Sequence, residues 1–97
     1  MRWPLAVRIA KIEGFPHKLP GRLHNPGSLV YARQREAVLG ERGFARFSDD
    51  EAGWRALERD LDLKIGRGMG LREIAYARCG PGDDPERYLA KLTGKIP

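Results

Sequence analysis

The sequence predicts a mainly α-helical α+β fold, with about four helices and a small β hairpin. Three observations predict it: apolar residues recur at helical spacing, capping residues mark several helix ends, and two short β-prone runs lie between the helices. With 97 residues, of which 41% are hydrophobic and 32% charged, the chain suits one domain spanning residues 1–97. Disorder and insertion into a membrane are not expected from this composition.

The first helix is expected from Pro4 to Glu13, where apolar residues recur every three or four positions and the proline suits the first turn. Gly14 marks its end. Prolines and glycines then crowd the following residues so densely that we expect a loop over residues 14–27, with neither helix nor central strand.

Two β-prone runs follow, at residues 28–31 and 44–47, and a small hairpin or sheet is expected to pair them. Turn-forming residues at 40–43 lie between the runs. Residues 33–39 contain good helix formers, so one helical turn there is the alternative.

A longer helix is expected to start at Ser48, because the following Asp49, Asp50 and Glu51 complete a capping box and favour the positive end of the helix dipole. Glycines from Gly66 onward end it. Its apolar stripe consists of Trp54, Leu57, Leu61 and Ile65.

Two short helices complete the prediction. The third helix runs from Leu71 to about Arg78, where a Gly-Pro-Gly segment follows. The fourth begins after Asp84, which suits the cap position, and Gly94 ends it.

Charge and cysteine content exclude several classes of protein. Eighteen Lys and Arg against thirteen Asp and Glu give a net charge of +5, which favours a polyanionic partner such as nucleic acid, anionic lipid or bacterial cell wall. The single Cys79 and two histidines exclude a disulfide scaffold and offer no metal-site spacing. No cofactor is expected. The N-terminal residues lack an uncharged stretch long enough for a signal peptide, so secretory export is not expected.

Glu13 is the first candidate for chemistry, because it lies at the edge of the apolar face in the last turn of its helix. Burial and the negative end of the helix dipole both favour a neutral carboxyl, the form that a general acid needs. The alternative is that Glu13 only marks the helix end and pairs with an arginine. Asn25 in the HNPGSL segment is the second candidate, with turn formation as its alternative role.

Four segments occur in an order that resembles a known family: IAKIEGF, HNPGSL, GFARFSDDEAGWRAL and LREIAYARCGPGDDPERYLAKLTG. Together they resemble small phage and prophage-associated proteins similar to the lysozyme-like superfamily, whose turn usually reads Asn-Asn-Pro-Gly-Asn-Leu. The resemblance covers nearly the whole chain and implies a lysozyme-like fold.

The resemblance also implies cleavage of peptidoglycan between N-acetylmuramic acid and N-acetylglucosamine. Glu13 matches the glutamate that protonates the glycosidic oxygen. The residues implied to contact the substrate are Asn25, Ser28, Tyr31, Tyr76 and Tyr88.

The chain departs from the family pattern at several positions. His24 and Ser28 stand where the turn usually has asparagine, and Arg78 stands where proline is expected. No Asp occurs between Glu13 and Asp49, although glycoside hydrolysis normally uses a second carboxylate about 5–9.5 Å away. A lytic transglycosylase mechanism with one glutamate is therefore preferred over a muramidase with two carboxylates.

The alternative function is a non-catalytic module: a phage structural component with an inactive lysozyme-like fold, or a basic module that binds cell wall or nucleic acid. Nucleic acid is the less favoured ligand, because no expected helix concentrates arginines on one face and no reader motif occurs. Under either hypothesis we expect a monomer whose partners are glycan strands or virion proteins. We expect the chain to stay cytoplasmic until lysis releases it, or to travel on the virion, and to act at the bacterial cell wall.

Overall fold

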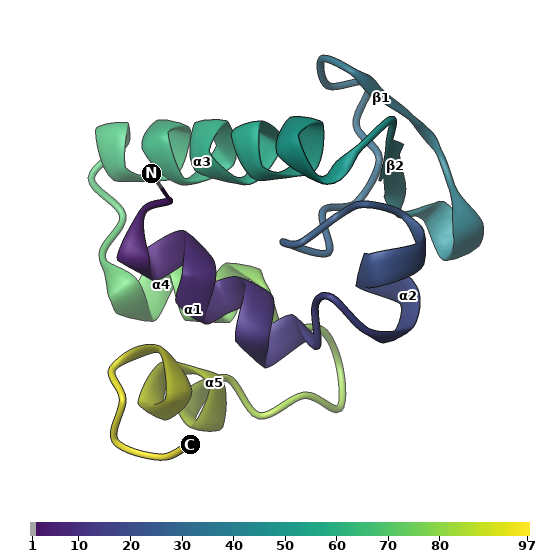
Figure 1. Ribbon diagram of the computed structural model, residues 1–97. Coiled ribbons are helices and arrows are strands. Elements are labelled where there is room, and N and C mark those ends of the chain that lie inside the picture. Colours follow the sequence, from purple (N-terminus) through teal and green to yellow (C-terminus); the bar gives the residue numbers. More distant parts are fainter. Residues whose placement is uncertain (1) are drawn as a thin grey trace. The chain divides into compact units, whose positions relative to one another are not determined.

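The computed structural model describes residues 2–97 and confirms a mainly α-helical α+β fold (Figure 1). Within these residues it has five α-helices and one two-stranded antiparallel sheet. The chain divides into two compact units, an N-terminal unit that ends at Asp60 and a C-terminal unit, Leu61–Pro97.

Helix α1, Pro4–Glu13, has the predicted bounds, with its proline in the first turn. Gly14 ends the helix in a left-handed conformation at φ 98°. The Gly14 N–H donates to Lys11 O at 3.1 Å and the Phe15 N–H to Ala10 O at 3.0 Å, which is the pair of hydrogen bonds that defines a Schellman turn. The end of α1 is therefore fixed by the backbone itself.

Helix α2, Lys18–Arg22, lies inside the segment for which a loop was expected, so that prediction is wrong. Its proline, Pro20, is the third helical residue. A proline is tolerated there because the N–H groups of the first turn have no partner inside a helix. The density of prolines limits the helix to five residues without preventing it.

The hairpin consists of β1, Ala37–Leu39, and β2, Ala45–Phe47, joined through a 3₁₀ turn, η1, Glu41–Gly43. The prediction of a strand at 44–47 is confirmed, but its ladder partner is β1 and not residues 28–31. The alternative prediction of a helical turn at residues 33–39 is also wrong. Residues 28–31 contribute only an isolated bridge, Val30 opposite Phe44, because the short connection through η1 brings β1 to β2 first.

One face of this hairpin packs into the core of the N-terminal unit. Ala45 and Phe47 of β2 are buried together with Ala52 and Ala56 of α3. Three partly buried residues pack against this cluster: Leu29, Tyr31 and Ala37.

Helix α3, Asp50–Gly66, begins two residues later than expected, and the capping side chain is that of Asp49 rather than Ser48. The Ala52 N–H donates to Asp49 Oδ1 at 2.8 Å, the bond that an N-cap carboxylate makes to the third helical residue. Glu51 pairs with Arg2 instead of closing a capping box.

The predicted apolar stripe of α3 is buried only in its middle. Leu57 and Leu61 are fully buried, Trp54 is half-buried, and Ile65 is 50% exposed. The stripe therefore overestimates the length of α3 that contributes to the core.

The C-terminal unit contains α4, Leu71–Ala77, and α5, Pro85–Leu92, which pack against each other. Both helices were predicted. Asp84 caps α5, since its carboxylate accepts a hydrogen bond from the Arg87 N–H at 3.1 Å. No helix in residues 2–97 combines the length and the hydropathy of a membrane span.

An ion pair connects α3 to the turn before β1. Arg55 Nη2 lies 2.8 Å from Glu36 Oε2, and Arg55 Nε lies 3.4 Å from Glu36 Oε1. This hydrogen bonding, with the positive charges of Arg55 and Arg59, lowers the pKa of the Glu36 carboxyl below its usual 4.5, although partial burial opposes the change. The pair is exposed to solvent, so salt weakens it.

We expect Gly53→Ala to destabilise the protein even though alanine favours helices. A Cβ at Gly53 would lie 2.1 Å from His24 O and 2.7 Å from Pro26 Cδ, and this overlap should lower the free energy of unfolding by roughly 1–3 kcal/mol. The matched control is Gly66→Ala, at the other end of α3, where nothing lies within 4 Å. Urea denaturation of both variants tests the prediction, and equal stabilities would contradict the close packing at Gly53.

Glu36→Gln should lower the Tm at neutral pH and have no effect in acid. Because Arg55 lowers the pKa of Glu36 in the folded protein, the pair stabilises the fold above the unfolded pKa and loses this effect as the pH falls through the folded value. The Tm difference between wild type and variant should be small, as for an exposed pair, and should vanish once the pH falls below the lowered pKa of Glu36 in the folded protein. Thermal melts monitored by circular dichroism provide the measurement, and a difference that persists in acid would exclude the pair as its cause.

Candidate functional site

Glu13 is the last residue of α1 and directly precedes the left-handed Gly14. It is half-buried. Because the Schellman turn holds the backbone on both sides of this residue, its Cα has a fixed position at the C-terminal end of the helix. A carboxyl at such a place can exchange a proton with a ligand without being fully exposed to water.

The chain after Glu13 is anchored to α3 within the N-terminal unit. The ring of Phe15 meets the ring of Trp54 edge to face, with centroids 5.6 Å apart and an interplanar angle of 83°. The guanidinium of Arg2 lies 4.8 Å from the centroid of the same indole, a distance at which a cation is attracted to an aromatic face.

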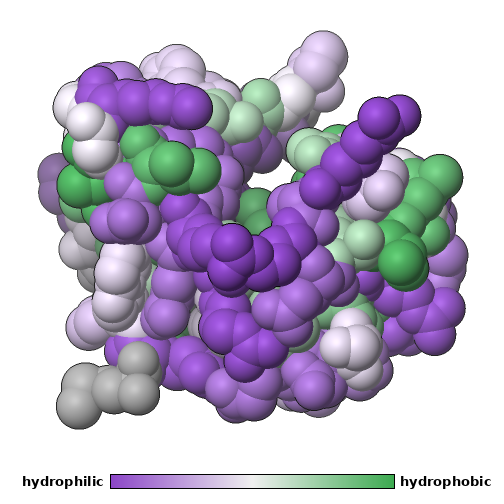
Figure 2. All heavy atoms as spheres, turned by 90° about the horizontal axis from the view of Figure 1, so that it is seen from above, coloured by the Kyte–Doolittle hydropathy of each residue, from purple (hydrophilic) through white to green (hydrophobic). Residues whose placement is uncertain are grey.

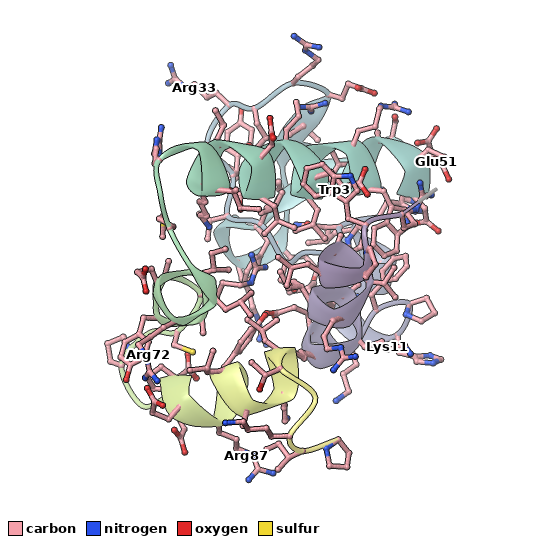
Figure 3. All side chains as sticks on the ribbon, turned by 90° about the vertical axis from the view of Figure 1, so that its left-hand side faces the viewer. Trp3, Lys11, Arg33, Glu51, Arg72 and Arg87 are labelled. Atoms are coloured by element: carbon pink, nitrogen blue, oxygen red, sulfur yellow. The ribbon has the colours of Figure 1, made fainter. Side chains whose placement is uncertain are left out.

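The other end of α1 is also tied to α3. The Trp3 N–H donates to Glu58 Oε2 at 2.9 Å, and Figure 3 shows Trp3 beside α3. Arg2 forms its ion pair with Glu51 in the first turn of that helix. Helix α1 is thus held at both ends, so the place of Glu13 depends on contacts that lie far apart in the sequence.

Asn25 is buried, with 1% of its surface exposed. Its Nδ2 donates to Leu29 O at 3.0 Å and to Ala45 O at 2.9 Å, while its Oδ1 accepts from the Leu29 N–H at 3.0 Å. Both amide hydrogens are therefore used inside the protein. The observed role of Asn25 is to join the Asn-Pro-Gly loop to β2, and its amide has no donor left for a ligand.

The loop that carries Asn25 fits closely against α3. His24 O faces Gly53 so tightly that no larger residue fits there, and a Cβ at Gly27 would lie 2.6 Å from Leu57 Cδ1. His24 Nδ1 lies 2.8 Å from Asp50 Oδ1 in the first turn of α3. This pairing was not predicted, because nothing local in the sequence relates two residues 26 positions apart.

Ser28 and Tyr31 lie in the same loop and its extension. Ser28 is half-buried, has a left-handed backbone at φ 49°, and donates its N–H to Asn25 O at 3.1 Å. Tyr31 packs its side chain against the buried cluster around Phe47. Of the implied substrate-contacting residues, Glu13, Asn25, Ser28 and Tyr31 belong to the N-terminal unit.

Tyr76 and Tyr88 belong to the C-terminal unit. The Tyr76 hydroxyl bonds to Glu86, which also pairs with Arg72. The hydrogen bond to Glu86 is the main cause that raises the pKa of Tyr76. The Tyr88 hydroxyl accepts a hydrogen bond from Arg78 Nε at 3.0 Å. Both hydroxyls therefore have protein partners, which orient the rings in their own unit.

The first two aspartates after Glu13, Asp49 and Asp50, have structural partners. Asp49 caps α3, and Asp50 pairs with His24. Neither is set aside as a second carboxylate for hydrolysis. Residues 2–97 also contain no cluster of three or more His, Cys, Asp or Glu side chains that could hold a metal ion.

No family model, curated protein or solved structure matches the chain. The arrangement offers one half-buried carboxyl, Glu13, at a position fixed by the backbone and by aromatic contacts. Such a group can act as a proton donor and then as a proton acceptor.

Asn25→Ala should destabilise the protein strongly. It removes three hydrogen bonds and leaves the part-buried backbone groups of Leu29 and the buried carbonyl of Ala45 without this partner, which should lower the free energy of unfolding by roughly 2–4 kcal/mol. Gln34→Ala is the matched control, because its amide also bonds to two backbone groups but at an exposed site. Urea denaturation should show a much smaller loss for Gln34→Ala, and similar losses for both would contradict the structural role of Asn25.

Proposed function

We propose that this protein cleaves the glycan strands of peptidoglycan, with Glu13 as both general acid and general base. The observation that carries the proposal is the place of Glu13: a half-buried carboxyl at a helix C-terminus whose backbone the Schellman turn fixes. The resemblance of the IAKIEGF and HNPGSL segments to lysozyme-like proteins supports the same role.

The proposed reaction is a transglycosylation within one sugar. The protonated Glu13 carboxyl donates its proton to the glycosidic oxygen, and the bond between this oxygen and the anomeric carbon breaks. The Glu13 carboxylate then takes the proton from the hydroxymethyl group of the same sugar. The oxygen of this hydroxymethyl group bonds to the anomeric carbon and closes an anhydro ring. The proton that it loses returns Glu13 to its protonated form.

Transglycosylation is preferred to hydrolysis because hydrolysis needs a second carboxylate, about 5–9.5 Å from the first. Asp49 caps α3, and Asp50 bonds to His24. An intramolecular hydroxyl replaces the water that such a carboxylate would activate, so a single glutamate is sufficient.

The net charge of +5 supports an anionic target such as the cell wall. Under this proposal the partners are peptidoglycan glycan strands, and the protein reaches them after lysis or as part of a virion. We keep three aromatic rings as proposed substrate contacts, those of Tyr31, Tyr76 and Tyr88. Asn25 is not proposed to bind the substrate directly, because its side chain serves to hold its loop in place.

Glu13→Gln should abolish glycan cleavage while the protein stays folded. Because the amide cannot donate the acid proton, release of soluble products from purified peptidoglycan should fall by about a hundredfold or more. Mass spectrometry of the products should identify anhydro-muropeptides from wild type. Glu41→Gln is the matched control, since it makes the same change at an exposed carboxylate that pairs with Arg22, and it should leave cleavage unchanged.

Other products would overturn parts of the proposal. Reducing-end muropeptides would indicate hydrolysis and require a second carboxylate. If neither wild type nor Glu13→Gln releases products, the catalytic proposal is wrong, and the alternative of a non-catalytic binding module is favoured.

The binding module has its own supporting observation. Exposed arginines extend from the N-terminal unit. In the described residues Arg33 has no ion pair, and Arg46 acts on Glu41 only through its charge. Such a surface attracts anionic polymers. Affinity for DNA with a steep salt dependence would favour nucleic acid as the ligand, whereas co-purification with virions would favour a structural role.

A further inference from the structure

The sheet has an outer face that does not pack into the core. Side chains alternate between the two faces of a strand; Ala45 and Phe47 face the core, so Phe44 and Arg46 face outward. Val38 pairs with Arg46 and Val30 with Phe44, which places both valines on the same side as these residues. We call Val30, Val38, Phe44 and Arg46 the outer face.

This outer face carries more apolar side chains than a solvent-exposed sheet face usually does. Val30 is 66% exposed and Val38 is 59% exposed, and the neighbouring Leu39 at the end of β1 is 65% exposed. The solvent side of an antiparallel sheet normally carries polar side chains. Figure 2 shows that hydrophobic atoms reach the molecular surface in patches bordered by hydrophilic atoms.

Positive charge borders the outer face. Arg46 lies on it, Arg42 lies in the turn that joins β1 to β2, and Arg22 of α2 reaches Glu41 in the same turn, with Nη2 3.3 Å from Oε2. The bond from Arg22 and the charges of Arg42 and Arg46 all act on Glu41. Three arginines against one glutamate leave the turn with a net positive charge.

Size and charge together select the occupant of this surface. Three apolar side chains are too few for the roughly 800 Å² per partner that a stable protein interface buries, and like charges oppose a second copy of the chain. Nucleic acid would satisfy the arginines but offers no hydrocarbon to the aliphatic side chains. An anionic lipid bilayer offers both phosphate groups and hydrocarbon, and it needs no large complementary surface.

We propose that the hairpin docks on anionic phospholipid membranes, with Val30 and Val38 of the outer face entering the boundary between headgroups and acyl chains. Arg42 and Arg46 bind the lipid phosphates. The binding is peripheral and reversible, since few apolar side chains are buried. This inference does not rest on glycan cleavage, because the hairpin can hold the protein at a membrane whether or not Glu13 acts on a substrate.

Co-sedimentation of the full chain with lipid vesicles tests the proposal. Wild type should bind vesicles of phosphatidylcholine with about 30% phosphatidylglycerol, bind pure phosphatidylcholine weakly, and dissociate as NaCl rises from about 0.05 to 0.5 M. The double variant Arg42→Gln/Arg46→Gln should reduce the partition coefficient by at least about tenfold, or several-fold for each arginine. Val30→Ser/Val38→Ser should reduce it at low salt as well.

Two control variants match these changes outside the hairpin. Arg67→Gln/Arg87→Gln removes the same charge from the C-terminal unit, and Leu63→Ser/Ile65→Ser replaces two side chains that are 59% and 50% exposed on α3. Both should bind like wild type. Circular dichroism verifies that every variant is folded, and Val38→Ser alone supplies a second outer-face variant if Val30→Ser/Val38→Ser unfolds.

Three outcomes would overturn the proposal. The first is no binding of wild type to the anionic vesicles. The second is an equal loss of binding in the hairpin and control variants, which would indicate an effect of total charge alone. The third is a concentration-dependent dimer in sedimentation velocity that Val38→Ser removes, which would make the outer face an interface between two copies of the chain.

Discussion

The side-chain amide of Asn25 is the interaction on which the N-terminal unit depends most directly. It bonds to Leu29 on one side and to Ala45 on the other, so a single buried residue closes the loop and attaches it to β2. Because buried polar groups must be satisfied, the loop cannot leave β2 without exposing or orphaning several of them. The loop in turn presents His24 O to Gly53, which fixes how closely α3 approaches.

The position of Glu13 follows from a second set of constraints that begins at Gly14. Local backbone bonds end α1 in a defined direction, and the next side chain, Phe15, meets Trp54 on α3. Neither constraint is sufficient alone: the Schellman turn sets direction over a few residues, while the aromatic contact sets the distance from α3. Together they give a carboxyl a reproducible place, which matters because proton transfer depends on positioning within a few tenths of an ångström.

The sequence was a good guide where local chemistry decides the structure. Pro4, Gly14 and Asp84 placed helix ends correctly because caps act within one turn. It failed where two partners compete or where the partner is distant: β2 pairs with β1 across a short turn and not in a ladder with residues 28–31, and His24 bonds to Asp50, 26 positions away. Asn25 illustrates both the success and the failure. The turn-forming residues around it predicted the loop correctly, but they could not predict that its side-chain amide bonds to β2, twenty residues away.

The ion pairs also explain how a modest excess of positive charge becomes available at the surface. Glu36, Glu41, Glu51 and Asp50 each bind a cationic or histidine side chain within the protein, so their charges act locally and contribute little to the field farther away. Exposed arginines that form no ion pair in the described residues, such as Arg33, then dominate any attraction to polyanions. That attraction is screened by salt, whereas the proton transfer proposed for the half-buried Glu13 depends on short-range geometry, so ionic strength alone should separate binding to an anionic surface from the proposed chemistry.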